Sequence, residues 1–382
     1  MGGLGEFMSV QFKCAVISDP HVALPETIWD HPSRFHLVEV SIPALEQIFD
    51  ELTEFAPDFL LMPGDLTQHG ERCNHEWLIN RLKQLPFPTY VVPGNHDMPE
   101  RDGGDRRLGR DDFPQYYRDF GYGTGDRQSY HQEILPGIHL IGLNSNVFDD
   151  DGQQLGMGYL DEAQFVWLEQ TLDRLRGEWI MVMIHHNVIE HLPNQMRHPL
   201  GRRYMLKNNQ DVLNLLDDAG VSLIFTGHLH VQDVAQWGSL VEITTGSLVS
   251  YPHPYRLLTV SDRPDQSTWL QIQSHRIAAV PDFPELATRS REWIGARSEP
   301  FMLKLLTNEP LNLPPAEAHE LVSDLRYFWA DVAHGDTLFE FEQFPAAARQ
   351  YFESFSAVNA AGQPQLIDNA IALQLRSQRQ VS

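Results

Sequence analysis

The sequence predicts an α/β fold in which short buried strands alternate with amphipathic helices. Apolar runs such as 59–62 and 179–184 have the length of buried strands. Several segments between such runs repeat apolar residues near the helical period of 3.6. Polar side chains follow the runs directly, and in α/β sheets that edge is where ligands bind. These observations place the candidate site at the carboxyl ends of the strands.

Length and composition allow a sizeable buried core. The 382 residues suffice for one large domain, or for a domain with a smaller one. Hydrophobic residues make up 42% and charged residues 21%, which is typical of a globular protein. We predict that residues 1–10 are a leader or disordered segment, and that Met8 is the native start. A main domain at 11–278 would follow, and then a mostly helical extension at 281–382.

Net charge and cysteine content limit the classes of binding partner and the cellular location to be expected. The formal net charge of −24 argues against nucleic acid, because phosphate backbones are bound by basic surfaces. It does not exclude a small anionic substrate, since bound metal ions can reverse the local field. No apolar run approaches the roughly 20 residues that span a bilayer, so no membrane partner is expected. With only Cys14 and Cys73, a disulfide framework is not expected and a reducing, cytoplasmic location fits.

The first half of the chain contains successive strand–helix steps. In order, we expect a strand at 12–18, a helix at 34–55, a strand at 59–62, a helix at 75–85 and a strand at 89–92. Pro43 falls inside the first helix, so this helix either starts there or is kinked. The segment 98–125 is rich in Gly, Asp and Arg. It is either a solvated surface loop or a lid whose arginines hold anionic groups; these arginines are at 101, 106, 107 and 110.

The second half continues the alternation and then changes character. We expect a strand at 138–143, a helix at 161–176, and strands at 179–184 and 223–226. Asp161 and Gln164 resemble a capping box at the start of that helix. Three further strands, at 240–244, 255–260 and 269–274, would form a second sheet. Beyond 281, prolines punctuate helical patterns at 321–332, 337–355 and 366–375, which would cover the core or contact a second copy.

Residues that can bind a metal ion follow five of the predicted strands. In extended backbone, alternate residues face the same side, so His228 and His230 can point at one ion. After the strand 179–184 come two adjacent imidazoles, His185 and His186. The collected residues are Asp19, His21, Asp65, Asn95, His96, His185, His228 and His230.

The types of these side chains predict the kind of metal. Carboxylate, amide oxygen and imidazole suit Mn, Fe, Zn or Co better than Ca, which would want more oxygens. One ion cannot accommodate all of these ligands when three or four of them are imidazoles. Two ions that share one bridging carboxylate account for the whole set. Such a pair clamps the attacking and leaving oxygens of an in-line displacement.

The ordered motifs resemble the five blocks of the calcineurin-like metallophosphoesterases. They are Asp19-Pro20-His21, Gly64-Asp65, Gly94-Asn95-His96-Asp97, His185 and Gly227-His228-Leu229-His230. Within that superfamily the chain resembles the bacterial class III cyclic-nucleotide phosphodiesterases and their glycerophosphodiesterase relatives. The resemblance covers roughly residues 12–275 and makes 11–278 the catalytic domain. It implies a four-layer α-β-β-α sandwich, to which 281–382 would be a helical extension.

The resemblance also implies roles for individual residues. It implies one metal ion held by Asp19, His21, Asp65 and His230, and a second held by Asp65, Asn95, His185 and His228. His186 is the alternative to His185, which we prefer because it is the first residue after the strand. The ions would be divalent or trivalent Fe, Mn or Zn. A metal-bound hydroxide would attack, and His96 would be the catalytic residue that donates a proton or hydrogen bond to a phosphate oxygen.

The function that follows is hydrolysis of small phosphodiesters, such as cyclic nucleotides or glycerophosphodiesters. A phosphomonoesterase of the same superfamily is the main alternative. A non-catalytic scaffold would be expected to lack ligands or the catalytic histidine, and here all are present. A nuclease is disfavoured by the acidic balance. The partners expected are a small phosphate-ester substrate and a second copy of the chain in a homodimer.

Overall fold

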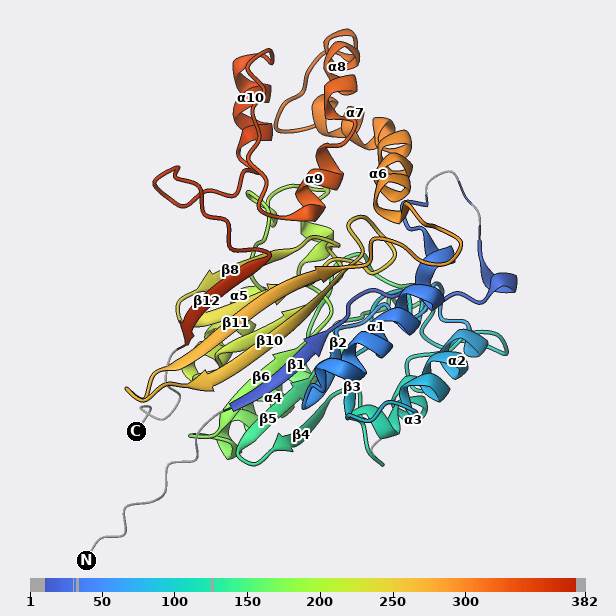
Figure 1. Ribbon diagram of the computed structural model, residues 1–382, viewed down its shortest axis with the longest axis vertical. Coiled ribbons are helices and arrows are strands. Elements are labelled where there is room, and N and C mark those ends of the chain that lie inside the picture. The colour runs from blue at the N-terminus through green and yellow to red at the C-terminus, as the bar shows by residue number, and fades with distance from the viewer. Residues whose placement is uncertain (1–10, 30, 32–33, 125–126, 376–382) are drawn as a thin grey trace, which may run out of the picture.

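Two six-stranded sheets form the centre of the molecule. The computed structural model describes residues 11–29, 31, 34–124 and 127–375, so the predicted leader at 1–10 lies outside the described residues. The first sheet has the order β12-β11-β10-β1-β2-β3 and the second has the order β4-β5-β6-β7-β9-β8. Figure 1 shows helices on the outer sides of the sheets, as expected for a four-layer α/β sandwich.

The strands have the following bounds. In the first sheet they are β1 (Gln11–Val16), β2 (Phe59–Met62), β3 (Thr89–Val91), β10 (Pro254–Asp262), β11 (Thr268–Arg276) and β12 (Ala370–Leu375). In the second sheet they are β4 (Tyr130–Leu135), β5 (Ile138–Gly142), β6 (Trp179–Met183), β7 (Leu223–Thr226), β8 (Asp233–Trp237) and β9 (Leu240–Thr244). The strands β1, β2 and β3 run parallel to one another, as do β5, β6, β7 and β9.

The division of strands between the sheets differs from the prediction. We expected 240–244 to lie in one sheet with 255–260 and 269–274. Instead β9 pairs with β7, with Phe225 opposite Ile243, while β10 pairs antiparallel with β1. Hydrophobic patterning identifies a strand, but it does not specify the partner strand when both faces are buried.

The helices that cover the sheets are α1 to α5. Their bounds are α1 (Ser41–Phe55), α2 (Arg72–Leu82), α3 (Phe113–Tyr116), α4 (Glu162–Arg174) and α5 (Asn209–Asp218). The predicted helix 34–55 begins only at Ser41, after a 3-10 turn at Val38–Val40. Pro43 therefore lies in the first turn, where the N–H that it lacks has no intrahelical acceptor. The Asp161 side chain caps α4 by accepting from the Gln164 N–H at 2.8 Å, as the capping pattern predicts.

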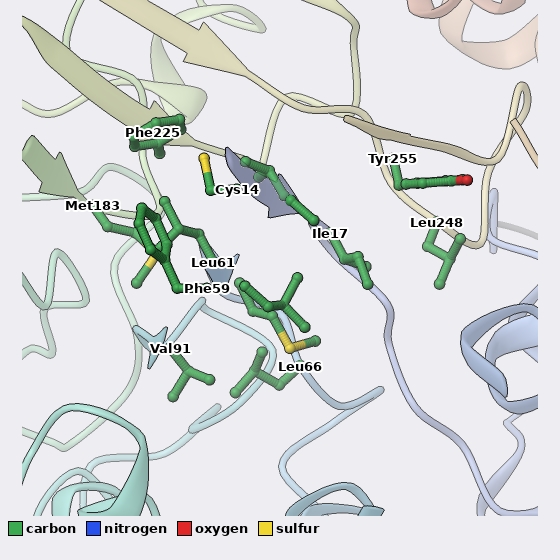
Figure 2. Close-up of a cluster of buried hydrophobic side chains, with 14 of the residues drawn as sticks. Cys14, Ile17, Phe59, Leu61, Leu66, Val91, Met183, Phe225, Leu248 and Tyr255 are labelled. Carbon is green, nitrogen blue, oxygen red and sulfur yellow. The ribbon is translucent and has the colours of Figure 1, made fainter. Parts of the chain in front are cut away.

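The core lies between the sheets and extends under the helices. Along β6, Met181 and Met183 join the cluster between the sheets, whereas Ile180 and Val182 pack with α4 and α5. This alternation is the two-residue period of a strand buried on both faces. In Figure 2, Cys14 of β1 and Phe225 of β7 belong to the same buried cluster, which therefore joins the two sheets.

Residues after 281 form helices and also extend the first sheet. The helices are α6 (Leu286–Arg297), α7 (Glu299–Thr307), α8 (Pro315–Leu321), α9 (Phe328–His334) and α10 (Ala346–Glu353). They lie together at one end of the sheets (Figure 1, orange to red). Helices α7 to α10 share a hydrophobic cluster that includes Met302 and Phe352. The prediction of a helix at 366–375 is wrong, because Ala370–Leu375 pairs with β11 as strand β12. Only part of 337–355 is helical. Within the described residues, no helix has the length and apolar character needed to cross a bilayer.

A buried arginine links the two sheets and the segment before β12. The Arg256 side chain on β10 is fully buried. It donates to the carbonyl oxygens of Thr244 at 2.9 Å, Asp233 at 3.3 Å and Asp368 at 2.5 Å. Burial lowers the pKa of Arg256 to about 10, so the group still carries its charge at neutral pH. One side chain thus connects strands of both sheets.

We predict that Arg256→Met lowers the free energy of unfolding by at least about 3 kcal/mol. The substitution leaves three carbonyl oxygens without this donor, and a buried unsatisfied acceptor costs roughly 1–3 kcal/mol. Denaturant unfolding followed by circular dichroism measures the change. The matched control is Arg127→Met at an exposed position, where a change within about 0.5 kcal/mol is expected. Equal effects of the two substitutions would contradict this role of Arg256.

Candidate metal centre

The predicted site residues converge at one edge of the two sheets. Asp19 and His21 follow β1, Asp65 follows β2, and Asn95 and His96 follow β3, all in the first sheet. The remaining residues follow strands of the second sheet, namely His185 after β6 and His228 and His230 after β7. Backbone hydrogen bonds join the loops within each sheet. The His21 N–H donates to the Asp65 carbonyl at 3.0 Å, and the Gly227 N–H donates to the His185 carbonyl at 3.1 Å.

The first group of potential ligands is compact. One ligand atom from each of four residues lies within 4.8 Å of the others, and the four are Asp19, His21, Asp65 and His230. His230 Nε2 lies 3.0 Å from Asp19 Oδ1, and His21 Nε2 lies 3.7 Å from Asp65 Oδ2. This is the set that the resemblance implies for one ion.

The second group shares Asp65 with the first. Asp65, His185 and His228 also place ligand atoms within 4.8 Å of one another. His185 Nε2 lies 3.4 Å from Asp65 Oδ1 and 3.1 Å from the amide oxygen of Asn95. Asp65 therefore presents Oδ2 to one group and Oδ1 to the other. This is the arrangement that a carboxylate shared by two ions requires.

The backbone of the potential ligands is unusual. Asp19, His21, Asp65, His228 and His230 all lie in the left-handed region, with φ between 41° at His21 and 64° at His228. Residues other than glycine enter this region rarely, and each instance costs roughly 1–3 kcal/mol where the conformation is strained. Such residues cluster at functional sites. The conformation lets a strand end turn sharply, so that its next side chains face the neighbouring loops.

Two glycines allow these loops to approach one another. A Cβ atom on Gly94 would lie 2.2 Å from both the backbone nitrogen and Oδ1 of Asp65. A Cβ atom on Gly227 would lie 2.3 Å from Asp19 Oδ2. No side chain fits at either position while the carboxylates stay in place. The motifs Gly-Asn-His-Asp and Gly-His-Leu-His therefore need their glycines for close packing.

Asp97 and Glu242 fix the loops from behind. The Asp97 carboxylate is buried and accepts from the backbone N–H groups of Leu66, Thr67 and Gly94 at 2.8–3.1 Å. Burial and the nearby Asp65 raise the pKa of Asp97 to about 7. On the other sheet, the carboxylate of Glu242 accepts from the N–H groups of residues 188 and 189 and from the hydroxyl group of residue 226. Each carboxylate connects two loops that carry potential ligands.

Electrostatic effects favour the protonation states that bind metal. Burial, followed by repulsion from neighbouring imidazoles, lowers the pKa of His21 and His228 well below the usual value. Burial alone would raise the pKa of Asp65, but His185 and His96 hold it well below its usual range. Metal ions bind neutral imidazole and ionised carboxylate. Burial lowers the pKa of His185, but the neighbouring Asp65 carboxylate raises it to about 9, so this imidazole would release a proton when an ion binds. Asp65, His21 and His228 are already in the form that coordinates a cation.

His21 provides a direct test of whether metal ions fit. The residue is fully buried, yet neither ring nitrogen has a hydrogen-bond partner among the described residues. A buried polar atom left unsatisfied costs roughly 1–3 kcal/mol, so such atoms usually have an unseen partner. A cation between His21 Nε2 and the carboxylates would satisfy this nitrogen. The donor set therefore fits a metal ion on physical grounds.

The two adjacent histidines point to different neighbours. His185 Nδ1 lies 2.8 Å from the Pro63 carbonyl oxygen, which orients its Nε2 toward Asp65 and Asn95. His186 Nδ1 instead lies 2.8 Å from the Ser145 hydroxyl group. Burial, followed by His185, lowers the pKa of His186 to about 3. The choice of His185 as ligand stays a prediction, and this geometry favours it.

A cavity of about 360 Å³ lies over these groups. Its base includes Asp65, Asn95 and His228, and His96 lies beside them. Sequence reasoning missed His36, which also lines the cavity. Its ring stacks on His21 at a centroid distance of 4.6 Å, and the two residues form a possible ligand group with His230. No strand end or motif marks His36, because its loop is folded onto the site by tertiary contacts.

The lid interpretation of 98–125 is not supported. Three of the arginines pair with carboxylates of their own surroundings: Arg101 with Asp102 at 3.2 Å, Arg107 with Glu100 at 3.6 Å, and Arg110 with Asp161 at 3.0 Å. None of the predicted lid arginines lines the cavity, whose arginine is Arg203 from the loop after β6. The surface-loop alternative describes residues 101–107 better, whereas Phe113, Tyr117 and Phe120 pack into the core.

Comparisons with known proteins agree with the geometry. A family model described as calcineurin-like phosphoesterase matches residues 12–232, more than half of the chain. The chain is 28% identical over 195 residues to "Probable glycerophosphodiester phosphodiesterase GpdQ" of Arcobacter nitrofigilis, a match that covers 50% of this chain and 63% of that protein. It is 22% identical over 279 residues to "3',5'-cyclic adenosine monophosphate phosphodiesterase CpdA" of Haemophilus influenzae, which covers 70% and 87% of the two proteins.

A solved structure shows the same fold. The crystal structure of a dimetal phosphatase from Danio rerio superimposes with a TM-score of 0.52 and 15% sequence identity. The match covers 69% of this chain and 96% of that chain. At this level of identity the likeness concerns the fold alone.

We predict that His185→Ala and His186→Ala differ in metal content. His185 faces the shared carboxylate, so its loss should reduce the content from two ions per chain to one or fewer. His186 bonds to Ser145, so its loss should leave two ions bound. Elemental analysis after reconstitution with Mn²⁺ and dialysis measures both variants. Loss of an ion from His186→Ala alone would reverse the assignment.

Proposed function

The chain belongs to the calcineurin-like phosphoesterase family, and we propose on this basis that it hydrolyses small phosphodiesters at a two-metal centre. The observation that carries the proposal is the position of Asp65, whose two carboxylate oxygens face two different groups of imidazoles. One ion would be held by Asp19, His21, Asp65 and His230. The other would be held by Asp65, Asn95, His185 and His228. Iron, manganese and zinc all suit these donors.

The protein's own residues would position the phosphate and move a proton. When bound, two such ions would supply Lewis acidity to the phosphate and lower the pKa of a water molecule. Asp65 and the surrounding imidazoles would hold the ions at the base of the cavity, and the phosphate would bind there. Asp97 and Glu242 would keep the loops in register, because each accepts hydrogen bonds from two of them.

His96 is the proposed catalytic residue. Its Nδ1 lies 2.6 Å from the Gln68 carbonyl oxygen, which can only accept, so Nδ1 carries a proton. In the neutral ring, Nε2 would then be an acceptor. To donate a hydrogen bond or proton from Nε2 to a phosphate oxygen, the ring must be the imidazolium. We infer that His96 acts as the acid toward the departing oxygen in this protonated form.

The substrate class rests on the relatives. The names of two of them refer to glycerophosphodiesters and to 3',5'-cyclic adenosine monophosphate. Both are small phosphodiesters, and a cavity of about 360 Å³ is within the usual range of small-ligand sites. A phosphomonoesterase is the second candidate, because the same centre serves either chemistry. Nucleic acid is not proposed as a substrate, given the net charge of −24.

Domain organisation, oligomeric state and location complete the proposal. We propose 11–278 as the catalytic domain and 281–382 as its cap, because two cavity-lining residues, Phe301 and Trp329, belong to the latter segment. A homodimer through the aromatic-rich extension stays a prediction. Cys14 and Cys73 are free thiols, which fits the predicted cytoplasmic location.

A metal-reconstituted assay tests the reaction type. We expect turnover of bis(p-nitrophenyl) phosphate to exceed that of p-nitrophenyl phosphate after loading with Fe, Mn or Zn. The reason is that the diester is the class to which the named relatives refer. Initial rates from released p-nitrophenolate give kcat/KM for both compounds. A clear preference for the monoester would replace the diesterase proposal with the phosphatase alternative.

We predict that His96→Ala lowers kcat by roughly 10²–10⁴, the usual contribution of a positioned acid or base. Metal content should stay at two ions per chain, because His96 bonds to Gln68 and belongs to neither potential ligand group. Steady-state kinetics with elemental analysis checks both expectations. His319→Ala, at an exposed position on α8, is the control and should keep full activity. A loss of metal in His96→Ala would show His96 to be a ligand.

A further inference from the structure

Two aromatic side chains from the C-terminal extension line the cavity over the metal centre. They are Phe301 of α7 and Trp329 of α9, and they lie beyond the residues that match the family model. Their rings meet edge to face at a centroid distance of 5.5 Å. Phe35 and Tyr204 also line the cavity. The cavity thus combines a polar base with aromatic side chains from distant parts of the chain.

The position of Trp329 is determined by contacts with the loop after β7. Trp329 packs in a cluster with Leu229, the residue between His228 and His230. The Gln232 N–H donates to the carbonyl oxygen of Ala333 at 3.1 Å, which holds α9 against this loop. The aromatic wall is therefore built onto the same loop that carries two potential ligands. Its position relative to the metal centre is preorganised.

The helix that carries Trp329 is also anchored to α6. An ion pair between Arg291 and Asp331, at 2.8 Å, connects α6 and α9. Behind Phe301 and Trp329 lies a small cavity of about 30 Å³, which both residues line together with Leu305 and Tyr351. A space of this size holds little more than one water molecule. The wall is therefore backed mainly by apolar side chains.

The cavity has a polar side, at its base, and an aromatic side, formed by the wall. The carboxylate and imidazoles at the base would take metal ions and hence the phosphate group. Among the described residues, Arg203 is the only arginine that lines the cavity and no lysine lines it, so the aromatic side has little to attract a second anionic group. Aromatic rings bind flat apolar groups by stacking or edge contacts. An ester group that lies against Phe301 and Trp329 would therefore be aromatic or apolar.

We propose that Phe301 and Trp329 are specificity-determining residues that select phosphodiesters with one flat, aromatic ester group. The inference rests on the phosphodiesterase activity proposed above. It goes further by naming the class of diester that the protein would prefer. Contacts between a ring and a stacked base contribute enough to change affinity by about tenfold or more. The effect should fall mainly on KM, because these residues are not at the reacting atoms.

The test compares two diesters in the metal-loaded, full-length protein. The aromatic diester is bis(p-nitrophenyl) phosphate, and the one without a ring is glycerophosphoglycerol, whose ester groups carry no charge that an aromatic ring would attract; its hydrolysis is followed by phosphorus NMR. For each substrate, the kcat/KM of a variant is divided by that of the unaltered protein, which cancels the different reactivities of the leaving groups. For Trp329→Ala we expect a loss of about tenfold or more with the aromatic diester and of less than about twofold with the other.

Further variants test whether the effect comes from the aromatic rings of the wall. Trp329→Phe should retain most of the preference, because it keeps a ring in the wall. Phe301→Leu should behave as Trp329→Ala and replaces it if that variant fails to fold. Phe339→Ala is the matched control, since Phe339 packs in the extension but does not line the cavity. Circular dichroism checks that each variant is folded.

The outcomes separate this inference from the proposed function. Equal losses with both diesters in the wall variants, or no loss with either, would overturn the selection of aromatic esters while leaving the diesterase activity intact. Turnover of neither diester by the unaltered protein would overturn the proposed function itself. A selective loss with the aromatic diester, absent from Phe339→Ala, supports the role of the wall.

Discussion

The buried carboxylate of Asp65 is the interaction on which the site depends. The residue is 1% exposed, so it has lost nearly all of its hydration, and an unpaired charge in that position would be strongly unfavourable. The structure offsets this cost with the His96 N–H at 2.7 Å and with the imidazole of His185 at 3.4 Å. Because these partners come from both sheets, the carboxylate is stable only where the two sheets meet.

The surrounding fold provides that meeting point. The cluster between the sheets includes side chains of β1, β2, β6 and β7, so the ends of these strands are brought to one edge. Arg256 adds a polar connection from β10 to the backbone of the second sheet. The extension adds β12 to the far side of the first sheet and covers the site edge through the contact of α9 with the loop after β7. Sheet packing, ligand placement and the cavity wall are therefore parts of one arrangement.

Much of the site was predictable because its signals are local. Asp65 directly follows an apolar run, and Asn95 and His96 follow another, so the ends of the strands are visible in the sequence. The strand partners of β9 and β10 were not predictable, since hydrophobic patterning identifies a strand but specifies neither its partner nor its register; β9 is moreover buried on both faces. Strand β12 was taken for a helix because pairing with the edge of β11 decides its conformation. Tertiary packing alone brings three further residues to the cavity, and no nearby sequence motif predicts their position. They are His36, Phe301 and Trp329.

The left-handed backbone at five of the potential ligands has a consequence for evolution. Glycine would relieve the strain at Asp19, His21, Asp65, His228 or His230, yet it would remove the donor atom at the same time. Stability and metal binding therefore favour different residues at the same positions. A lineage that no longer needed the metal centre would gain stability by accepting glycine there.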